Sequence, residues 1–276
     1  MKKFMRLAVA TLLLVSMIFL LTGCTQEKSE GEFKVGMECD YPPFNWTQTT
    51  DANGAVPIQG SKEFAGGYDV EIAKQIAKAL NKDLVIVKMD WNGLAPAVQA
   101  GTIDAIIAGM SPTKERQQSI DFSVPYYRSQ LVMVVKKDGP YAEAKTLQDF
   151  AGAKITAQLN TFHYSVIDQI EGVEKQTAMD NFAAMRVSLE SGTIDGYVSE
   201  RPEAMSAAAA NENFKMVEFM PEAGFVASDE DIAIAVGFKK GQDEQLKKIN
   251  EAVDAITDEN RVKIMDEAIK NQPVAQ

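Results

Sequence analysis

The chain has 276 residues, with 28 lysines and arginines against 39 aspartates and glutamates and a formal net charge of −11. This length and a hydrophobic content of 46% predict a folded protein of two domains and exclude a disordered chain. The acidic balance argues against nucleic-acid binding, which needs clustered basic residues to neutralise phosphates. One histidine and two cysteines are too few for a Cys/His zinc site or a haem ligand pair, so we expect neither metal nor cofactor.

The N-terminus carries the pattern of an export signal. Three basic residues precede an apolar run over 7–21, which is shorter than the ~20 residues of a membrane-spanning helix. The run ends in Leu-Thr-Gly-Cys at 21–24, which resembles the bacterial lipobox. We therefore predict a signal peptide over 1–23, a lipidated Cys24 and a flexible tether over 24–32, with the mature chain at the outer face of the cell membrane. Cys39 is then the one unmodified thiol, and we expect it to be buried.

Short strands and helices alternate from residue 33 onward. The pattern predicts, in chain order, a strand over Phe33–Glu38, a helix from an N-cap at Asp69 to Asn81, a strand over Leu84–Val87, a helix from about Gly93 to Gly101 and a strand over Ile103–Ala108. This βαβα rhythm is typical of an α/β fold with a parallel sheet and crossover helices.

One junction occurs twice. Gly-Thr-Ile-Asp-Ala at 101–105 and Gly-Thr-Ile-Asp-Gly at 192–196 each follow a helix and lead into a strand. The repetition predicts two similar α/β lobes. Ligands of such sheets bind beyond the carboxyl ends of the strands, so two lobes would enclose a cleft.

The segment after the strand at 103–108 is a candidate anion site. Ser111 followed by Pro112 is a helix-start signal, and a helix N-terminus attracts anions. Arg116 could supply a bidentate guanidinium to a carboxylate, although a surface arginine after a capped turn is the alternative. His163 has no nucleophile elbow nearby, and we interpret it as a polar residue of the surface or the cleft rim.

Aromatic and acidic residues follow the other strands. Tyr41, Phe44 and Trp91 lie at the carboxyl ends of predicted strands, where they could stack on a ligand or pack in the core. Glu200 holds the matching place in the second half and could bind an ammonium group. The alternative is a surface pair between Glu200 and Arg201.

From Phe33 to about Ile269 the sequence resembles the bacterial extracellular solute-binding proteins of family 3, the polar amino-acid receptors of ABC importers. The motifs that carry the resemblance are Val35–Glu38, Tyr41–Phe44, Gly67–Ala73, Trp91–Pro96, Gly101–Ala105, Ser111–Arg116 and Asp121–Tyr127. It implies a two-lobed type II periplasmic-binding-protein-like fold, with lobe 1 over 33–125 and 235–276, lobe 2 over 126–234, and chain crossings near 125–127 and 232–238.

The resemblance also implies the roles of single residues. Arg116 would bind the α-carboxylate, helped by Ser111 and by the backbone at Ala108 and Gly109. Glu200 would receive the α-ammonium, and Tyr41 and Trp91 would wall the ligand side chain. Glu38 would meet a distal cation. Thr161 would offer a hydroxyl to the carboxylate, whereas Phe162 departs from the family's Gln-x-Gly-Thr-Thr pattern, because a large ring stands where a small polar group is usual.

These roles predict a monomeric, non-enzymatic receptor that closes on an amino acid and delivers it to a membrane permease with a cytoplasmic ATPase. Glu38, the aromatic walls and the acidic surface favour arginine, lysine or histidine as the ligand, with glutamine or another polar neutral amino acid as the alternative. A lipid-tethered member implies a Gram-positive source. An enzyme on the same fold, such as a small-carboxylate dehydratase, and a sensory module acting through a separate protein are the rival classes.

Overall fold

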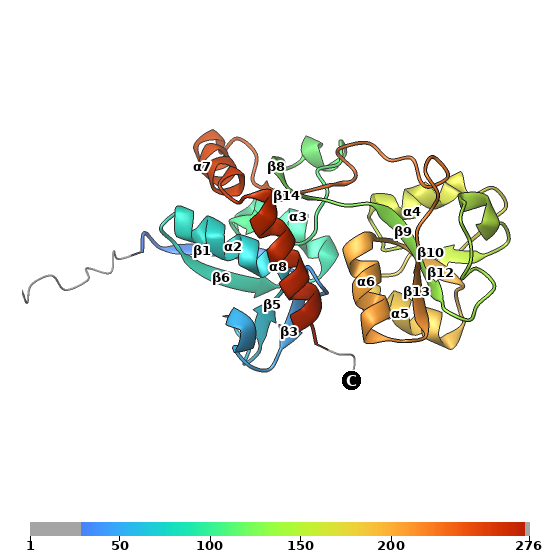
Figure 1. The fold of residues 1–276 in the computed structure, drawn as a ribbon. Helices are drawn as coiled ribbons and strands as arrows, with labels where there is room; N and C mark the ends of the chain where they lie inside the picture. The colour runs from blue at the N-terminus through green and yellow to red at the C-terminus, as the bar shows by residue number, and fades with distance from the viewer. Residues whose placement is uncertain (1–28, 274–276) are drawn as a thin grey trace, which may run out of the picture. The chain divides into compact units, whose positions relative to one another are not determined.

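The computed structural model describes residues 29–273, so the predicted signal peptide and Cys24 lie outside the described residues. Within this range no helix combines the length and the apolar character that a bilayer crossing requires. The described fold consists of two five-stranded sheets, a small antiparallel sheet and the helices that cover them (Figure 1).

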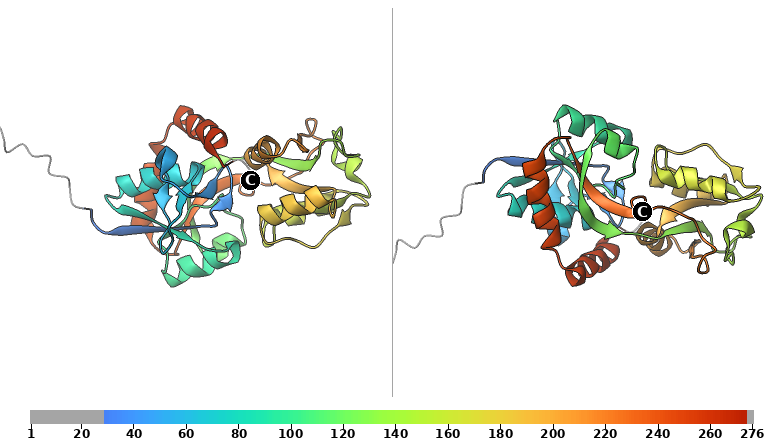
Figure 2. Two further views of the ribbon diagram at one scale, coloured as in Figure 1. Left: turned by 90° about the horizontal axis from the view of Figure 1, so that it is seen from below. Right: turned by 90° about the horizontal axis from the view of Figure 1, so that it is seen from above.

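The first sheet has the strand order β6-β1-β7-β14-β8. Its strands are β1 (Glu32–Met37), β6 (Asp83–Lys88), β7 (Ala105–Ile106), β8 (Asp121–Arg128) and β14 (Ala233–Phe238). β1 pairs in parallel with β6 and β7, whereas β14 is antiparallel to both of its neighbours. Its helices are α2 (Tyr68–Ala79), α3 (Trp91–Ala100), α7 (Asp243–Asp254) and α8 (Asp258–Asn271). Figure 2 shows α3 on one face of the sheet and α7 and α8 on the other.

The second sheet has the order β11-β10-β12-β9-β13. Its strands are β9 (Leu131–Lys136), β10 (Lys154–Thr156), β11 (Glu174–Lys175), β12 (Gly196–Glu200) and β13 (Phe214–Val217). Its helices are α4 (Phe162–Val166), α5 (Phe182–Ser191) and α6 (Arg201–Ala210), with 3-10 turns η3 (Leu147–Phe150) and η4 (Ile167–Gln169). As in the first sheet, one strand, β10, pairs in parallel with two neighbours, and one strand, β9, is antiparallel to both of its neighbours, β12 and β13.

A four-stranded antiparallel sheet and two further turns lie outside these sheets. The small sheet consists of β2 (Asp40–Tyr41), β3 (Asn45–Gln48), β4 (Val56–Pro57) and β5 (Phe64–Gly66), and the turns are η1 (Ala52–Gly54) and η2 (Arg116–Gln118). One apolar core surrounds the first sheet and continues into α5 and α6, and a smaller core lies around the second sheet. The two cores adjoin at the second sheet, because Val132 and Val134 of β9 belong to the first core and Met133 and Val135 to the second.

The repeated junction has the same structure in both halves. Gly101 and Gly192 end α3 and α5 in the left-handed region, with φ values of 76° and 77° that a glycine adopts without strain. Asp104 then accepts a hydrogen bond from the backbone amide of Lys34 at 2.8 Å, and Asp195 accepts one from Lys154 at 2.8 Å. Each aspartate therefore ties its strand to the neighbouring central strand, which confirms the prediction of two similar α/β halves.

Most predicted elements form, with shifted ends. β1 begins at Glu32, the last residue of the predicted tether, and Asn81 follows α2 in the left-handed region, as predicted. The N-cap prediction at Asp69 is wrong: Gly67 precedes the helix, and Asp69 lies buried in its first turn. The side chain of Asp69 cannot cap the helix because it accepts hydrogen bonds from Asn45 and Tyr126.

The helix predicted to begin at Ser111-Pro112 does not form. The chain is irregular there and reaches only the three-residue turn η2. Thr113, two residues later, closes this turn, because its hydroxyl and carbonyl accept the amides of Arg116 and Gln117. The helix N-terminus that the sequence predicts as an anion site is therefore absent. The candidate group for binding an anion in this segment is the Arg116 side chain.

The chain passes between the two large sheets twice, at residues 129–130 and along 218–232. The two passages are joined by a hydrogen bond from the amide of Ser129 to the carbonyl of Ile232 at 2.9 Å. β8 runs unbroken through residues 125–127, because its pairing with β14 continues to Arg128. The exact limits of the lobes at 125/126 and 234/235 stay a prediction.

Candidate functional site

Residues from both sheets surround one small cavity, and most of the predicted site residues lie on it. Nine of them line it, namely Glu38, Tyr41, Trp91, Ala108, Gly109, Ser111, Arg116, Thr161 and Phe162. Gln158, His163 and Phe182 complete the lining. The cavity has a volume of about 10 Å³, enough for about one water molecule. The chain thus brings the predicted residues together around a space that its own side chains largely fill.

Arg116 provides the positive charge of the site. Its guanidinium donates hydrogen bonds to the carbonyls of Ser111 at 2.9 Å and Asn160 at 3.0 Å, and it lies 5.0 Å from the ring centroid of Trp91. Burial lowers the pKa of Arg116 to about 10, because desolvation disfavours the charged form. The Arg116 side chain therefore contacts neutral acceptors at positions where a carboxylate would bind more strongly.

Glu38 lies at the carboxyl end of β1 and is the acidic residue of the cavity. Its side chain is buried and accepts a hydrogen bond from the Gln158 amide at 3.2 Å. Burial, together with the nearby carboxylates of Asp40 and Asp90, raises the pKa of Glu38 to about 8. The Glu38 carboxylate is therefore costly without a cation beside it, and this end of the cavity favours a positively charged group.

Tyr41 forms an aromatic wall. Its ring stacks on Phe182 from the second half at 4.5 Å and on Phe44 at 5.1 Å. Phe44 itself does not line the cavity: it is fully buried behind Tyr41 and packs edge-on against Tyr127. The structure therefore places Phe44 as the support of the wall, with Tyr41 at the cavity.

Glu200 and His163 lie together beside the Tyr41 hydroxyl. The hydroxyl donates to Glu200 Oε2 at 3.4 Å, and His163 Nε2 lies 3.5 Å from Glu200 Oε1. Glu200 is buried, and Arg201 forms its ion pair with Glu218 instead, so the alternative of a surface pair between Glu200 and Arg201 is wrong. His163 is only 5% exposed, so its interpretation as a surface residue is wrong. The position of α4 against β12 buries both side chains.

The loop before α4 crosses over Arg116 and Trp91. Asn160 has a φ of 58°, and its carbonyl accepts hydrogen bonds from Arg116 and, at 3.5 Å, from the Trp91 indole. The Thr161 hydroxyl donates to the carbonyl of Gln158 at 2.7 Å, and the ring of Phe162 lies 4.4 Å from that of His163. Thr161 and Phe162 thus reach the cavity, while the Thr161 hydroxyl is engaged within its own loop.

A buried hydrogen-bond chain supports the floor of the site. The amide of Gly109 donates to the Tyr126 hydroxyl at 3.2 Å, which donates to Asp69 at 2.7 Å; Asn45 also donates to Asp69, at 2.8 Å. Burial raises the pKa of Asp69 to about 7, although these hydrogen bonds oppose the shift. The Gly109 amide, predicted to assist a ligand carboxylate, is therefore committed to Tyr126. Cys39 is buried nearby as a free thiol, as predicted, and burial raises its pKa to about 12.

Three lining residues were not among the predicted ones. Gln158 is buried and donates a hydrogen bond to Glu38. It begins the segment 158–162 that corresponds to the family's Gln-x-Gly-Thr-Thr pattern, and this position could have indicated it as a site residue. His163 follows the same loop directly. Phe182 begins α5, and no pattern in the sequence indicates that its ring reaches across to Tyr41.

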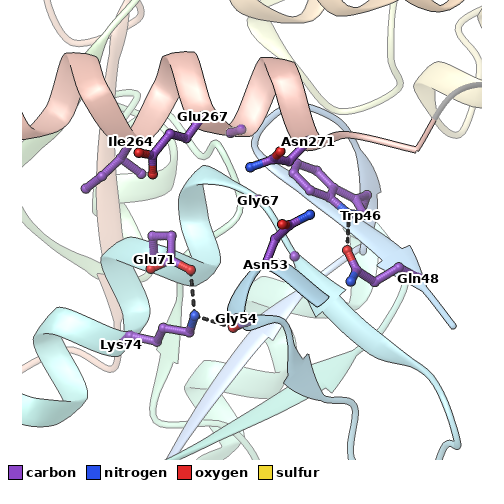
Figure 3. A pocket seen from close by; sticks show the side chains of 12 residues that line it. Trp46, Gln48, Asn53, Gly54, Gly67, Glu71, Lys74, Ile264, Glu267 and Asn271 are labelled. Carbon is purple, nitrogen blue, oxygen red and sulfur yellow. Dashed lines mark hydrogen bonds and ion pairs between the residues drawn. The ribbon is translucent and has the colours of Figure 1, made fainter. Parts of the chain in front are cut away.

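A larger hollow of about 200 Å³ lies elsewhere, between α8, α2 and the small sheet (Figure 3). Four of its polar side chains are already paired: Lys74 bonds to Glu71 and to the carbonyl of Gly54, and the Trp46 indole donates to Gln48 at 2.8 Å. None of the predicted site residues lines it. Converging charge and aromatic side chains, rather than size, identify the central cavity as the candidate site.

The chain resembles known proteins in sequence and in fold. The chain is 31% identical over 233 residues to a probable histidine-binding protein of Campylobacter jejuni, covering 80% of this chain and 82% of the relative. A Streptococcus pneumoniae amino-acid ABC transporter substrate-binding protein, solved with L-arginine, aligns with a TM-score of 0.76 at 27% identity, covering 87% and 94% of the two chains. An ancestral arginine-binding protein bound to glutamine aligns with a TM-score of 0.70 at 31% identity, covering 86% and 97%.

The structural neighbours confirm the two-lobed type II fold that the sequence predicts. The family comparison extends over the whole region in which the sequence resembles the family, from β1 into α8. Residues 33–269 match the family of bacterial extracellular solute-binding proteins, family 3, and the chain belongs to this family.

Proposed function

We propose that this protein is the extracytoplasmic receptor of an amino-acid ABC importer, which binds a cationic L-amino acid and releases it to a membrane permease served by a cytoplasmic ATPase. The observation that carries the proposal is one cavity lined by Arg116 and by the buried carboxylate of Glu38, with a second buried carboxylate, Glu200, behind it at the hydroxyl of the lining residue Tyr41. A free amino acid carries one anionic and at least one cationic group, and these side chains offer a partner for each.

Each group of the ligand has a proposed partner. The α-carboxylate replaces the carbonyls that now accept from Arg116, and the α-ammonium binds Glu200. Ser111, Thr161 and the backbone at Ala108 and Gly109 lie on the same cavity and assist the carboxylate, and the ligand side chain lies between the Tyr41 and Trp91 rings, beside Phe162. A distal cation then binds Glu38. This contact is favourable, because the cation offsets the repulsion between the Glu38 carboxylate and its like-charged neighbours.

Binding requires the two halves to separate. A cavity of about 10 Å³ cannot admit an amino acid, and contacts that join the halves close it. These contacts include Gln158 on Glu38, Phe182 on Tyr41 and, farther away, Ser206 on Gln272. We propose opening and closure about the two chain passages at 129–130 and 218–232, with lobes limited at 125/126 and 234/235.

The predicted N-terminal processing completes the proposal. We propose that residues 1–23 are removed, that Cys24 is lipidated, and that the tether holds a monomeric receptor at the outer face of a Gram-positive cell membrane. Radiolabelled palmitate incorporation tests this: Cys24→Ser should abolish labelling and release the protein into the medium, whereas Cys39→Ser should leave labelling unchanged. Retention of label by Cys24→Ser would refute the anchor.

The central experiment is calorimetry on Arg116→Ala with a panel of L-amino acids. Loss of the guanidinium should weaken binding by more than about a hundredfold, because it leaves a buried carboxylate unpaired. Arg128→Ala is the matched control, since it also removes one guanidinium but lies outside the cavity lining. Unchanged affinity in Arg116→Ala would overturn the proposed site.

A neutral polar amino acid is the second candidate ligand. An ancestral arginine-binding protein bound to glutamine is among the structural neighbours, so this fold holds glutamine in at least one relative. Thermal unfolding with the same panel of amino acids decides between the two ligands. A ligand at 100 times its Kd stabilises the folded protein by about 2.7 kcal/mol, so the amino acid that binds raises the unfolding temperature. We further propose binding without chemical change, which mass spectrometry of the recovered ligand tests; any conversion would favour an enzyme.

A further inference from the structure

His163 is a polar side chain of the cavity that the proposed ligand contacts leave unused. The residue is 5% exposed and lines the cavity, and neither ring nitrogen has a hydrogen-bond partner within residues 29–273. A buried polar atom without a partner costs free energy, and nearly all such atoms in folded proteins are satisfied. The His163 imidazole is therefore a buried polar group whose hydrogen bonds are unsatisfied in this structure.

The nearest charged group to this imidazole is Glu200. His163 Nε2 lies 3.5 Å from Glu200 Oε1, which is beyond an ordinary hydrogen bond, and the other carboxylate oxygen accepts from the Tyr41 hydroxyl at 3.4 Å. The other titratable groups on the cavity are Glu38, Tyr41 and Arg116. The Phe162 ring packs against the imidazole, with 4.4 Å between the ring centroids. Glu200, Tyr41 and His163 thus present three loosely engaged polar atoms close together.

We propose, resting on the function above, that His163 accepts a hydrogen bond from the ligand's α-ammonium beside Glu200 and so selects ligands with an unsubstituted primary α-ammonium. Such a group has three N–H donors, and Glu200 Oε1, the Tyr41 hydroxyl oxygen and an imidazole nitrogen are three acceptors. An N-methylated ligand lacks one donor and leaves one of these buried acceptors unsatisfied.

The test is isothermal calorimetry with L-arginine and Nα-methyl-L-arginine, or L-glutamine and its Nα-methyl form if arginine does not bind. The wild type should discriminate against the methylated ligand by about tenfold or more, the effect of one charge-assisted hydrogen bond. His163→Leu should bind the unmethylated ligand about tenfold more weakly and lose most of this discrimination. His163→Gln keeps an acceptor oxygen and should retain both within about threefold.

Tyr164→Leu is the matched control: it lies on the same helix but outside the cavity lining, so it measures the effect of losing a ring from α4.

The outcomes separate this inference from the proposed function. If no amino acid binds the wild type, the proposed function fails and the inference with it. If the wild type binds but His163→Leu keeps the full discrimination, the inference alone is overturned. A loss of affinity that Tyr164→Leu reproduces would mark a structural effect of α4 and would also overturn it.

Discussion

At the scale of single residues, the buried Glu38 makes stability depend on pH. Its pKa is raised from 4.5 to about 8 in the folded protein. Between about pH 4.5 and about pH 8, the Glu38 carboxyl keeps its proton in the folded protein but has lost it in the unfolded chain. The free energy of unfolding therefore falls as the pH rises through this range. Glu38→Gln should remove this loss and stabilise the unliganded protein at pH 8, by at most about 5 kcal/mol.

Urea unfolding of both proteins at several pH values tests this prediction. The two free energies of unfolding should converge near pH 4.5 and separate toward pH 8. A constant difference across this range would mean that Glu38 does not titrate there. Calorimetry on the same variant should show arginine losing affinity relative to glutamine, because the partner of the distal cation is gone.

The residues that sequence reasoning could place were those attached to strand ends. Glu38, Tyr41 and Trp91 follow strands of the first half, so strand topology alone predicted that they meet. Phe44 follows the same logic but lies behind Tyr41, because neighbouring residues in a turn point in different directions. Phe182 reaches the cavity only through contact between the halves, and local sequence patterns carry no information on that contact.

At the scale of elements, the turn after β7 depends on a glycine. Gly109 has a φ of 63°, and a Cβ atom there would lie 2.7 Å from Cε1 of Tyr41. Gly109→Ala should therefore displace the Tyr41 ring and weaken ligand binding by at least about tenfold, in addition to the backbone cost of roughly 1 kcal/mol. Gly101→Ala has a similar φ of 76° with open space around its Cβ, so it separates the two effects.

Calorimetry and thermal unfolding of both variants give the result. Gly101→Ala should lose stability but keep its affinity, whereas Gly109→Ala should lose both. Equal affinities would show that the Tyr41 ring can move without consequence for binding.

The repeated junction predicts matched energetics in the two halves. Asp104 and Asp195 each accept a strand amide at 2.8 Å, so Asp104→Ala and Asp195→Ala should each cost about 1–3 kcal/mol of stability. Denaturant unfolding measures both. The five-residue repeat was sufficient to predict this equivalence, because a glycine stop followed by an aspartate determines the local geometry. The Ser111-Pro112 signal failed, because the tertiary path to β8 leaves room only for a short turn.

At the scale of the whole molecule, Trp91 should report the separation of the halves. The chain has two tryptophans, and Trp46 lies in the small sheet, away from the central cavity. In Trp46→Phe, fluorescence then comes from Trp91, whose indole contacts Arg116 and the Asn160 carbonyl. Saturating arginine should shift the emission to shorter wavelength as water is excluded, and Arg116→Ala should abolish the shift. An emission unchanged by a ligand that binds in calorimetry would argue against closure.

The carbonyl of Asn160 gives the receptor an internal substitute for its cargo. It accepts one hydrogen bond from the guanidinium of Arg116, which also donates to the carbonyl of Ser111. In the proposed function, capture therefore exchanges one acceptor for another, and the net affinity is a difference between two contacts rather than the full strength of one. The reverse exchange would assist release of the ligand. As the ligand leaves, the Asn160 carbonyl can accept from Arg116 again, so the guanidinium is not left with an unsatisfied donor.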